Sequence, residues 1–394
     1  MMEAYIIGAV RTAVGRYNGS LAPMNAVELG TVVVKEIINR AKLSPERTNE
    51  VIMGNVIQAG LGQNPARQSA ILAGLPENIP SFTVNKVCGS GLKAVALAGQ
   101  AIVVEGSDII IAGGMESMTN APFLSRSMRW GQRLGNAEMI DTLINDALWD
   151  NFYDCHMGIT AENVAEKYHI TRKEQDEFAA LSQQKTEAAI KEGVFKDEIV
   201  PVRVKQERGE DKIFDTDEHP RFGTTVENLS KLKPAFKTDG TITAGNASGI
   251  NDGAAAVAVV SKRMLDELNP PWAFRILASQ ASALDPAFMG LGPITACKAL
   301  IAKADVSVKD LDVIEVNEAF ASQSIQVRRD MGWDMDKVNV NGGAIAIGHP
   351  VGASGARILV TLIYEMVRRN ARLGLASLCI GGGQGIAMII ERAK

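Results

Sequence analysis

A cysteine in a stretch of small residues is the first candidate for chemistry in this chain. Cys88 lies in the run VNKVCGSGLKA at residues 84–94, after a short apolar segment and before apolar residues that recur with helical spacing. We therefore predict that Cys88 lies where a strand or turn meets the N-terminus of a helix. Unpaired N–H groups and the helix dipole favour an anion there, so we expect a lowered pKa and a nucleophilic thiol. The alternative is a buried cysteine that only packs.

A histidine in the most specialised loop of the chain is the candidate base. His349 lies in NGGAIAIGHPVGASGAR, residues 341–357, where glycine and alanine allow the backbone to pass close to a ligand. Pro350 fixes the turn that presents His349, just before a helix that we expect to begin near Gly352. A rigidly placed, accessible imidazole suits a general base. A purely structural histidine is the alternative, although the chain has only four histidines.

A second cysteine precedes a run of glycines. The stretch LCIGGGQG, residues 378–385, predicts a strand, a glycine turn and a returning strand. Its glycines lack the G-x-G-x-x-G order and no helix follows, so a dinucleotide loop is disfavoured. We instead expect Cys379 to lie beside free backbone N–H groups that could form an oxyanion hole.

A polar residue at the end of a buried strand completes the candidate set. Asn317 follows the apolar run DVIEV, and sites in α/β folds lie at the carboxyl ends of parallel strands. There its amide could orient a water or a carbonyl. From spacing alone, Asn317 could equally be the N-cap of a helix over residues 318–330.

Helical and strand-like patterns alternate along the first 120 residues, which predicts an α/β fold with a mainly parallel sheet covered on both faces. Residues 120–247 are more charged and indicate an inserted domain. Asn55 at a strand end and Ser90 at a helix start have counterparts in Asn317 and Ser354, which predicts two similar halves. The expected strands are 50–58, 81–87, 107–113 and 254–261, and the expected helices are 25–41, 64–74, 89–105, 158–168 and 171–192.

Bulk composition narrows the class of protein. The 394 residues are 46% hydrophobic and 22% charged with a formal net charge of −4, which fits a globular protein and gives no basic field for nucleic acid or an anionic membrane. Four cysteines without a CxxC pair favour free thiols in a reducing cytoplasm and no metal site. We see no signal or transit peptide and no apolar run that approaches the length of a membrane span.

Four motifs together resemble the thiolase family. They are VCGSG around Cys88, VNEAF around Asn317, GHPVGASGAR around His349 and CIGGGQG around Cys379, in the order and spacing of that family over essentially the whole chain. Within the family the chain most resembles the biosynthetic members that act on acetyl-CoA. The run CHMGITAEN at 155–163 is one pointer, because members that prefer longer acyl chains usually lack the counterpart of His156.

The resemblance implies a ping-pong mechanism and a set of roles. His349 would activate Cys88 to form an acyl-enzyme from acetyl-CoA, and Cys379 would take a proton from the second acetyl-CoA, giving acetoacetyl-CoA and CoA. One oxyanion hole would be His349 with a water held by Asn317, and the other the N–H groups of Cys88 and Gly381. It also implies residues that bind CoA or line the acyl pocket, namely Arg221, Ser248, His156, Met157, Leu148, Phe236, Ala244, Ala247, Met289 and Phe320.

The same resemblance implies an organisation for the whole chain. We expect a duplicated α/β fold with central mixed sheets layered with helices, in which residues 1–119 with 248–270 form one half and 271–394 the other. Residues 120–247 would be a loop domain that binds CoA. We expect no tightly bound cofactor, CoA thioesters as substrates, and a homotetramer with contacts at 121–140.

Three other functions are possible. A ketoacyl synthase-like condensing enzyme would need a different set of bases, and a Cys–His–Asn hydrolase would leave Cys379 unexplained. A catalytically silent carrier on the same fold would bind CoA without exchanging it.

Overall fold

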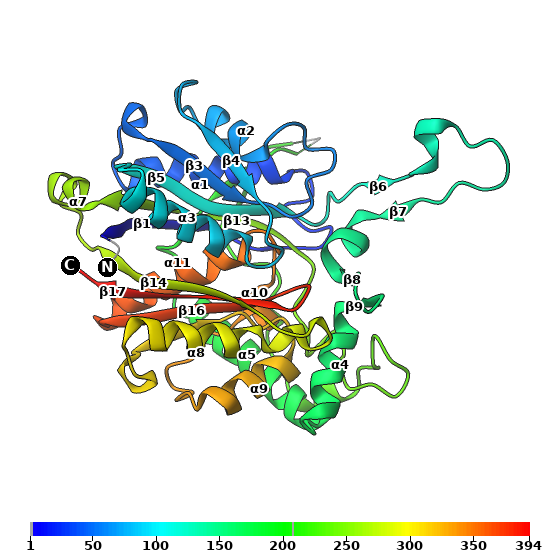
Figure 1. Ribbon diagram of the computed structural model, residues 1–394. Helices are drawn as coiled ribbons and strands as arrows, with labels where there is room; N and C mark the ends of the chain where they lie inside the picture. Colours follow the sequence, from blue (N-terminus) through cyan, green and yellow to red (C-terminus); the bar gives the residue numbers. More distant parts are fainter. Residues whose placement is uncertain (1–2, 207–208) are drawn as a thin grey trace.

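The computed structural model describes residues 3–206 and 209–394. Eleven of the described strands form one large twisted sheet with helices outside it and between its two parts, and six short strands form three separate two-stranded sheets (Figure 1). The strand order is β15-β16-β17-β14-β1-β13-β5-β3-β4. The strands of this path are β1 (Ala4–Thr12), β3 (Glu50–Gly54), β4 (Ser81–Val84), β5 (Ile109–Ser117), β13 (Asn251–Ser261), β14 (Phe274–Ala283), β15 (Val313–Val316), β16 (Leu373–Ile380) and β17 (Gln384–Arg392). Two short strands, β2 (Gly15–Arg16) and β10 (Ile199–Val200), pair beside it.

The helices lie in three layers. Helix α1 (Ala26–Arg40) and α2 (Pro65–Leu72) cover one outer face, and α8 (Gly292–Ala304) with α9 (Ala321–Met331) lies at the other (Figure 1). Between the two parts of the sheet, α3 (Ser90–Val104) packs against α11 (Ser354–Arg369). Both inner helices begin next to the predicted catalytic loops, so they bring the two loops together at one end of the layer. The structure has the layered α/β arrangement that we expected, with a mixed sheet and helices on both sides of it and between its parts.

The strand directions correct one prediction. Parallel pairs occur at β3–β4, β3–β5 and β15–β16, but β13 pairs antiparallel with both β1 and β5, and β17 pairs antiparallel with β14 and β16. The sheet is therefore mixed, and the expectation of a mainly parallel sheet was wrong for its centre. Alternating strands and helices predict parallel pairs only where a helix joins neighbouring strands, and the central strands come from distant parts of the chain.

The segment between β5 and β13 leaves the sheet. It forms an arm with the strands β6 (Phe123–Leu124) and β7 (Ile140–Asp141), which projects far from the body and exposes Trp130 and Leu134 (Figure 1). Its other elements are η2 (Ser127–Trp130), the π-helical turn η3 (Leu143–Leu148), β8 (Trp149–Asp150), β9 (Cys155–His156), α4 (Met157–Lys167), α5 (Arg172–Lys191), β11 (Val202–Val204), β12 (Lys212–Phe214) and α6 (Val226–Ser230). The remaining short helices are η1 (Pro45–Arg47), α7 (Lys262–Leu268), η4 (Pro286–Leu291), η5 (Val308–Asp310) and α10 (Ala344–Ile347). The division of the chain into domains stays a prediction.

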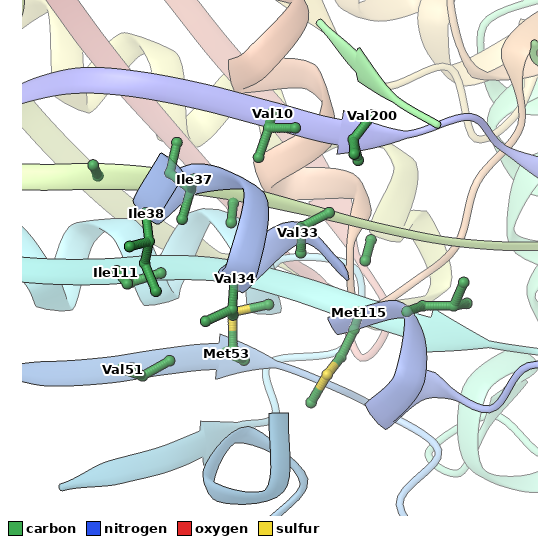
Figure 2. Packing of buried hydrophobic residues seen from close by; sticks show 14 of the residues in the cluster. Val10, Val33, Val34, Ile37, Ile38, Val51, Met53, Ile111, Met115 and Val200 are labelled. Carbon is green, nitrogen blue, oxygen red and sulfur yellow. The ribbon is translucent and has the colours of Figure 1, made fainter. Parts of the chain in front are cut away.

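The sequence pattern of α1 explains why it caps the sheet. Asn25 and Glu28 form a capping box at its N-terminus, which satisfies two of the free N–H groups there. One face of the helix, including Val33 and Ile37, then packs on β1, β5 and β13 (Figure 2). Each fully buried aliphatic side chain of this kind contributes about 1.5–3 kcal/mol to folding.

Two helical stretches are long and apolar enough to cross a membrane, so the expectation that no apolar run has that length was wrong. They cover residues 87–104 and 286–304, and 61% and 56% of them are buried inside the structure. Helix α3 is apolar because it packs on three strands and on α11 in the inner layer. Core helices of this kind meet the same length and composition criteria as membrane spans.

Candidate active site

A cavity of about 590 Å³ is lined by residues from widely separated parts of the chain, from Arg16 to Gly381. Its walls include Cys88, His349, Cys379 and Gly381, which the sequence placed in one site from positions far apart in the chain. All ten residues expected to bind CoA or the acyl group also line it: Arg221, Ser248, His156, Met157, Leu148, Phe236, Ala244, Ala247, Met289 and Phe320. Asn317 does not line the cavity, although its neighbours Ala319 and Phe320 do.

The turn that carries Cys88 is strained. Strand β4 ends at Val84 and α3 begins at Ser90, so Cys88 lies at the predicted strand-to-helix junction. The residue before it, Val87, has a φ of 48°, a left-handed conformation that is unfavourable for a β-branched side chain. The Ser90 hydroxyl holds this conformation, because it accepts from the Lys86 N–H and donates to the Val87 carbonyl. The strained turn leaves the half-buried thiol at the cavity wall.

The pKa of Cys88 departs from the sequence prediction. Burial raises it to about 11, while the N–H groups of Gly381 and of Cys88 itself act to lower it. The expectation of a lowered pKa from the helix terminus was wrong, because the desolvation of the thiolate outweighs the backbone donors. The thiol is therefore neutral at rest and needs a base during attack. The two N–H groups that face its sulfur are those expected to form an oxyanion hole.

His349 is buried and held in one orientation. The backbone N–H of His349 donates to Oδ1 of Asn251 at 2.8 Å. The Nδ1 atom of its ring lies 2.5 Å from the Ser354 hydroxyl. That hydroxyl also lies 2.8 Å from the Pro350 carbonyl, which can only accept. The single hydroxyl proton therefore goes to Pro350, so the hydroxyl must accept from an N–H at His349 Nδ1. This leaves Nε2 unprotonated and able to take a proton.

The surroundings of His349 keep the imidazole neutral. Burial, with a smaller contribution from the positive charge of Arg357, lowers its pKa to about 3. An uncharged ring is the form that a general base requires at neutral pH. The role of His349 as a base stays a prediction. The expectation of an accessible imidazole was wrong, because the residue is buried in the cavity wall. The sequence reading also missed the supporting role of Ser354.

Cys379 is the last residue but one of the strand β16, which the apolar pattern predicts. Its side chain is fully buried against Phe320, Met157 and Met289, and its Sγ lies 3.8 Å from Oε1 of Gln323. Burial, and secondarily the neighbouring Cys88, raises the pKa of Cys379 well above its usual range. Gln323, a glutamine within α9, had no signal in the sequence.

Asn317 is not a helix cap. Its backbone N–H donates to the Ser377 carbonyl, and α9 begins only at Ala321 with Phe320 as the N-cap. The N-cap alternative was therefore wrong, because the chain stays extended beyond the strand. The side chain is fully buried and, among residues 3–206 and 209–394, neither its oxygen nor its nitrogen has a hydrogen-bond partner. Such a group is expected to hold a water or a ligand atom.

The acyl end of the cavity is narrow and aromatic. The His156 ring stacks on Phe236 with centroids 4.6 Å apart, and its Nδ1 accepts from the Gly158 N–H. A Cβ at Gly158 would come within 2.2 Å of the Phe236 ring, so this position admits only glycine without movement. Phe320 meets Phe236 edge-on at 6.4 Å. These contacts form a closely packed aromatic wall of the cavity.

The open end of the cavity is polar. Arg221 and Ser248 lie there with Arg16, Tyr17 and His219, three residues that the sequence reading did not select. Burial and the nearby Arg221 lower the pKa of His219 to about 4, so His219 is neutral beside the positively charged Arg16 and Arg221. The strand β2 pairs with the start of β13, and this pairing brings Arg16 to the cavity. Within the described ranges, no group of three or more His, Cys, Asp or Glu side chains could hold a metal ion.

Two family models match the chain in succession. The thiolase N-terminal domain matches residues 4–263, and the thiolase C-terminal domain matches residues 271–392. The chain belongs to the thiolase family. This thiolase is 57% identical to the acetyl-CoA acetyltransferase of Allochromatium vinosum, over 98% of both chains. It is 55% identical to the acetyl-CoA acetyltransferase of Pseudomonas aeruginosa over the full length of both.

Solved structures agree with the fold. The Bacillus anthracis acetyl-CoA acetyltransferase superposes with a TM-score of 0.97 at 42% identity, covering 100% of this thiolase and 99% of that chain. Human mitochondrial 3-ketoacyl-CoA thiolase superposes with a TM-score of 0.95, also at 42% identity, over 99% of both chains. Membership of the family accounts for the second cysteine, which the hydrolase alternative leaves unexplained.

Proposed function

We infer that this thiolase is an acetyl-CoA acetyltransferase, which joins two acetyl-CoA molecules to acetoacetyl-CoA and releases CoA. The observation that carries the inference is the convergence of two thiols and one neutral imidazole on a single cavity. The reaction needs one nucleophile and one base that removes a proton from carbon, and each of the two cysteines can serve as one of them. The full-length relatives at 55–57% identity, which are named acetyl-CoA acetyltransferases, support the choice of substrate.

The first half-reaction transfers an acetyl group to Cys88. The Cys88 sulfur attacks the thioester carbonyl as Nε2 of His349 takes the thiol proton. The thiolate therefore forms only when the substrate is present. The oxyanion of the tetrahedral adduct accepts from N–H groups that the strained turn and the glycine turn place at the sulfur. The bond to CoA sulfur breaks, and Cys379 gives its proton to the departing CoA. Cys379 is then a thiolate.

The second half-reaction forms the carbon–carbon bond. The Cys379 thiolate takes a proton from the α-carbon of a new acetyl-CoA and becomes a thiol again. The resulting enolate oxygen would be held by His349 and by a water on the Asn317 amide, which has no other partner among the described residues. The enolate carbon attacks the acetyl carbonyl on Cys88, the carbon–sulfur bond breaks, and the proton on His349 returns to Cys88. All three groups are restored.

Substrate binding follows the polarity of the cavity. Arg221 and Ser248 at its open end would hold the nucleotide and pantetheine of CoA, and the pocket around Phe236 would hold the acetyl group. The exposed Met128, Trp130 and Leu134 of the arm would be contacts between subunits of a homotetramer. The division into two thiolase halves, residues 1–119 with 248–270 and 271–394, around a CoA-binding insert at 120–247, is part of the proposal. So is a cytoplasmic location, where the four cysteines would stay reduced.

Intact-protein mass spectrometry tests the proposed reaction. After brief exposure to acetyl-CoA, the parent is expected to gain one acetyl group that free CoA discharges, and Cys88→Ala is expected to gain none. Cys297→Ala is the matched control, because Cys297 is a buried thiol in α8 that packs away from the cavity. A parent that binds CoA in reducing buffer but never acetylates would overturn the proposal and favour the silent carrier.

A further inference from the structure

A buried carboxylate in β5 holds the two catalytic loops together. Glu116 is fully buried, and its two oxygens accept four hydrogen bonds from two parts of the chain, residues 55–57 and Gly352. Oε1 accepts from Nδ2 of Asn55 at 2.8 Å and from the N–H of Ile57 at 3.2 Å. Oε2 accepts from the N–H groups of Val56 at 3.0 Å and Gly352 at 2.9 Å. The catalytic steps above make no use of this residue.

The donors to Glu116 belong to segments beside the two reacting residues. Val56 and Ile57 form an apolar cluster with Val351, and Cys88 packs against it. Gly352 follows His349 by three residues in the loop that leads into α11. Glu116 therefore ties the wall beside the nucleophile to the loop that carries the base. Its position lets it control how the two halves of the site align.

The carboxylate of Glu116 packs directly against the backbone at Gly352. A Cβ at Gly352 would come within 2.5 Å of Glu116 Oε2 and 2.9 Å of the Asn55 Cα, so backbone and carboxylate are in direct contact. Other polar anchors of the His349 loop include Glu318 at the Ile345 N–H and Asn251 at the backbone N–H of His349. Of these three anchors, Glu116 is the one that also holds the segment beside Cys88.

We propose that Glu116 is a positioning residue for the acetyl transfer, which sets the alignment of His349 with the Cys88 thiol. The proposal rests on the roles assigned above to Cys88 and His349. Four donors facing two oxygens require an ionised carboxylate, which is the species that accepts at both oxygens. Burial raises the pKa of Glu116 to about 7, and the N–H groups of Val56, Ile57 and Gly352 offset part of this cost of burying the charge.

Two substitutions separate the geometry from the charge. In Glu116→Gln, one oxygen remains and the new NH₂ group must face one pair of N–H donors, whichever way the amide turns. Glu116→Asp keeps the charge but is one methylene shorter, so it cannot reach both loops. Asp312→Asn is the matched control, because Asp312 accepts from the Arg372 and Leu373 N–H groups at the far end of β16.

The direct measurement is the single-turnover rate of Cys88 acetylation at saturating acetyl-CoA, with the dissociation constant of CoA measured separately. We expect both Glu116 variants to acetylate at least about tenfold more slowly, since small misplacements of reacting groups cost that much or more. CoA binding and the Asp312→Asn rate should stay at the parent values. If Glu116→Gln fails to fold, Glu116→Asp decides the question. A folded variant that acetylates at the parent rate would overturn the proposal.

A double-mutant cycle distinguishes positioning from general support. If Glu116 acts through His349, the slowing caused by Glu116→Asp should disappear in a His349→Asn background. The same fold-loss in both backgrounds would show that Glu116 only stabilises the fold and would overturn the proposal. Acetylation of the parent and its loss in Cys88→Ala are scored first, so a failure of the proposed function appears as a different result.

Discussion

The Ser354 hydroxyl lies 2.5 Å from Nδ1 of His349 and donates its only proton to the Pro350 carbonyl. The hydroxyl therefore fixes the imidazole in the tautomer that protonates Nδ1 and leaves Nε2 free. In Ser–His–Asp triads a carboxylate has this orienting role. Here a neutral hydroxyl suffices, because the buried ring has a lowered pKa and carries a positive charge only during the reaction.

Removal of this hydroxyl should slow catalysis without preventing folding. In Ser354→Ala the ring loses its fixed tautomer, and we expect kcat/KM to fall by about tenfold or more, which is part of the roughly 10²–10⁴-fold that a general base contributes. Steady-state rates with acetoacetyl-CoA and CoA measure the effect. Ser69→Ala is the control, because this buried hydroxyl bonds the Val27 carbonyl away from the cavity. Parent-like kcat/KM in Ser354→Ala would contradict the orienting role.

The sequence predicted the site better than the environment of the site. The small residues around Cys88 and the loop of His349 are local patterns, and the structure places both residues as expected. The pKa values were not predictable, because desolvation comes from segments such as Met157 and Phe236 that fold over the thiols from elsewhere in the chain. Glu116 was missed for the same reason, since its partners are backbone groups of remote loops.

The strand directions show the same limit. Alternating strands and helices describe neighbours in sequence, and they correctly indicated the local units around β3 and β15. The pairing of β13 with β1 and β5 joins segments separated by more than a hundred residues, and no local pattern encodes it.

Buried histidines should make the protein less stable in acid. The pKa of His349 is about 3 in the fold, below its ordinary 6.5, so between these values the unfolded chain binds a proton that the fold does not. Above about pH 6.5 this histidine does not lower the free energy of unfolding. As the pH falls below that value, the free energy of unfolding decreases by up to about 1.4 kcal/mol per pH unit. Buried Glu116 acts with the opposite sign, because its pKa is raised. Comparing the parent with His349→Asn separates the contribution of this histidine from those of other buried groups.

Urea unfolding between about pH 4 and 6.5 measures this effect. The free energy of unfolding of His349→Asn should depend less steeply on pH than that of the parent, by nearly one proton. His169→Asn, at an exposed position, is the control and should keep the parent slope. Equal slopes for the parent and His349→Asn would show that the folded imidazole is not kept neutral.

A buried ion network supports the open end of the cavity. Arg11 bonds Glu198 at 2.6 Å and both oxygens of Asp217, with all three side chains buried. Arg11→Met leaves two buried carboxylates without their cation, and we expect the free energy of unfolding to fall by about 3–5 kcal/mol. The triple variant Arg11→Met, Glu198→Gln, Asp217→Asn should recover part of this loss, because no unpaired charge remains.

Denaturant titrations compare these variants with an exposed pair. Arg47→Met breaks an ion pair with Glu267 on the surface, where water screens the charges, and should leave the midpoint near that of the parent. If Arg11→Met shifted the midpoint no more than Arg47→Met, the network would be dispensable.

The width of the acyl pocket should set the preferred substrate. Met289 is buried beside Cys379 and Phe320, and Met289→Ala would extend the pocket beyond an acetyl group. We expect the ratio of kcat/KM for a longer 3-ketoacyl-CoA to that for acetoacetyl-CoA to rise about tenfold, within the 1–3 kcal/mol that a methylene-sized change provides. Met264→Ala is the control, because it removes the same atoms from the buried face of α7 in the core. It should lower the free energy of unfolding without changing the ratio. An unchanged ratio in Met289→Ala would place the acyl chain elsewhere, against His156 rather than against Met289.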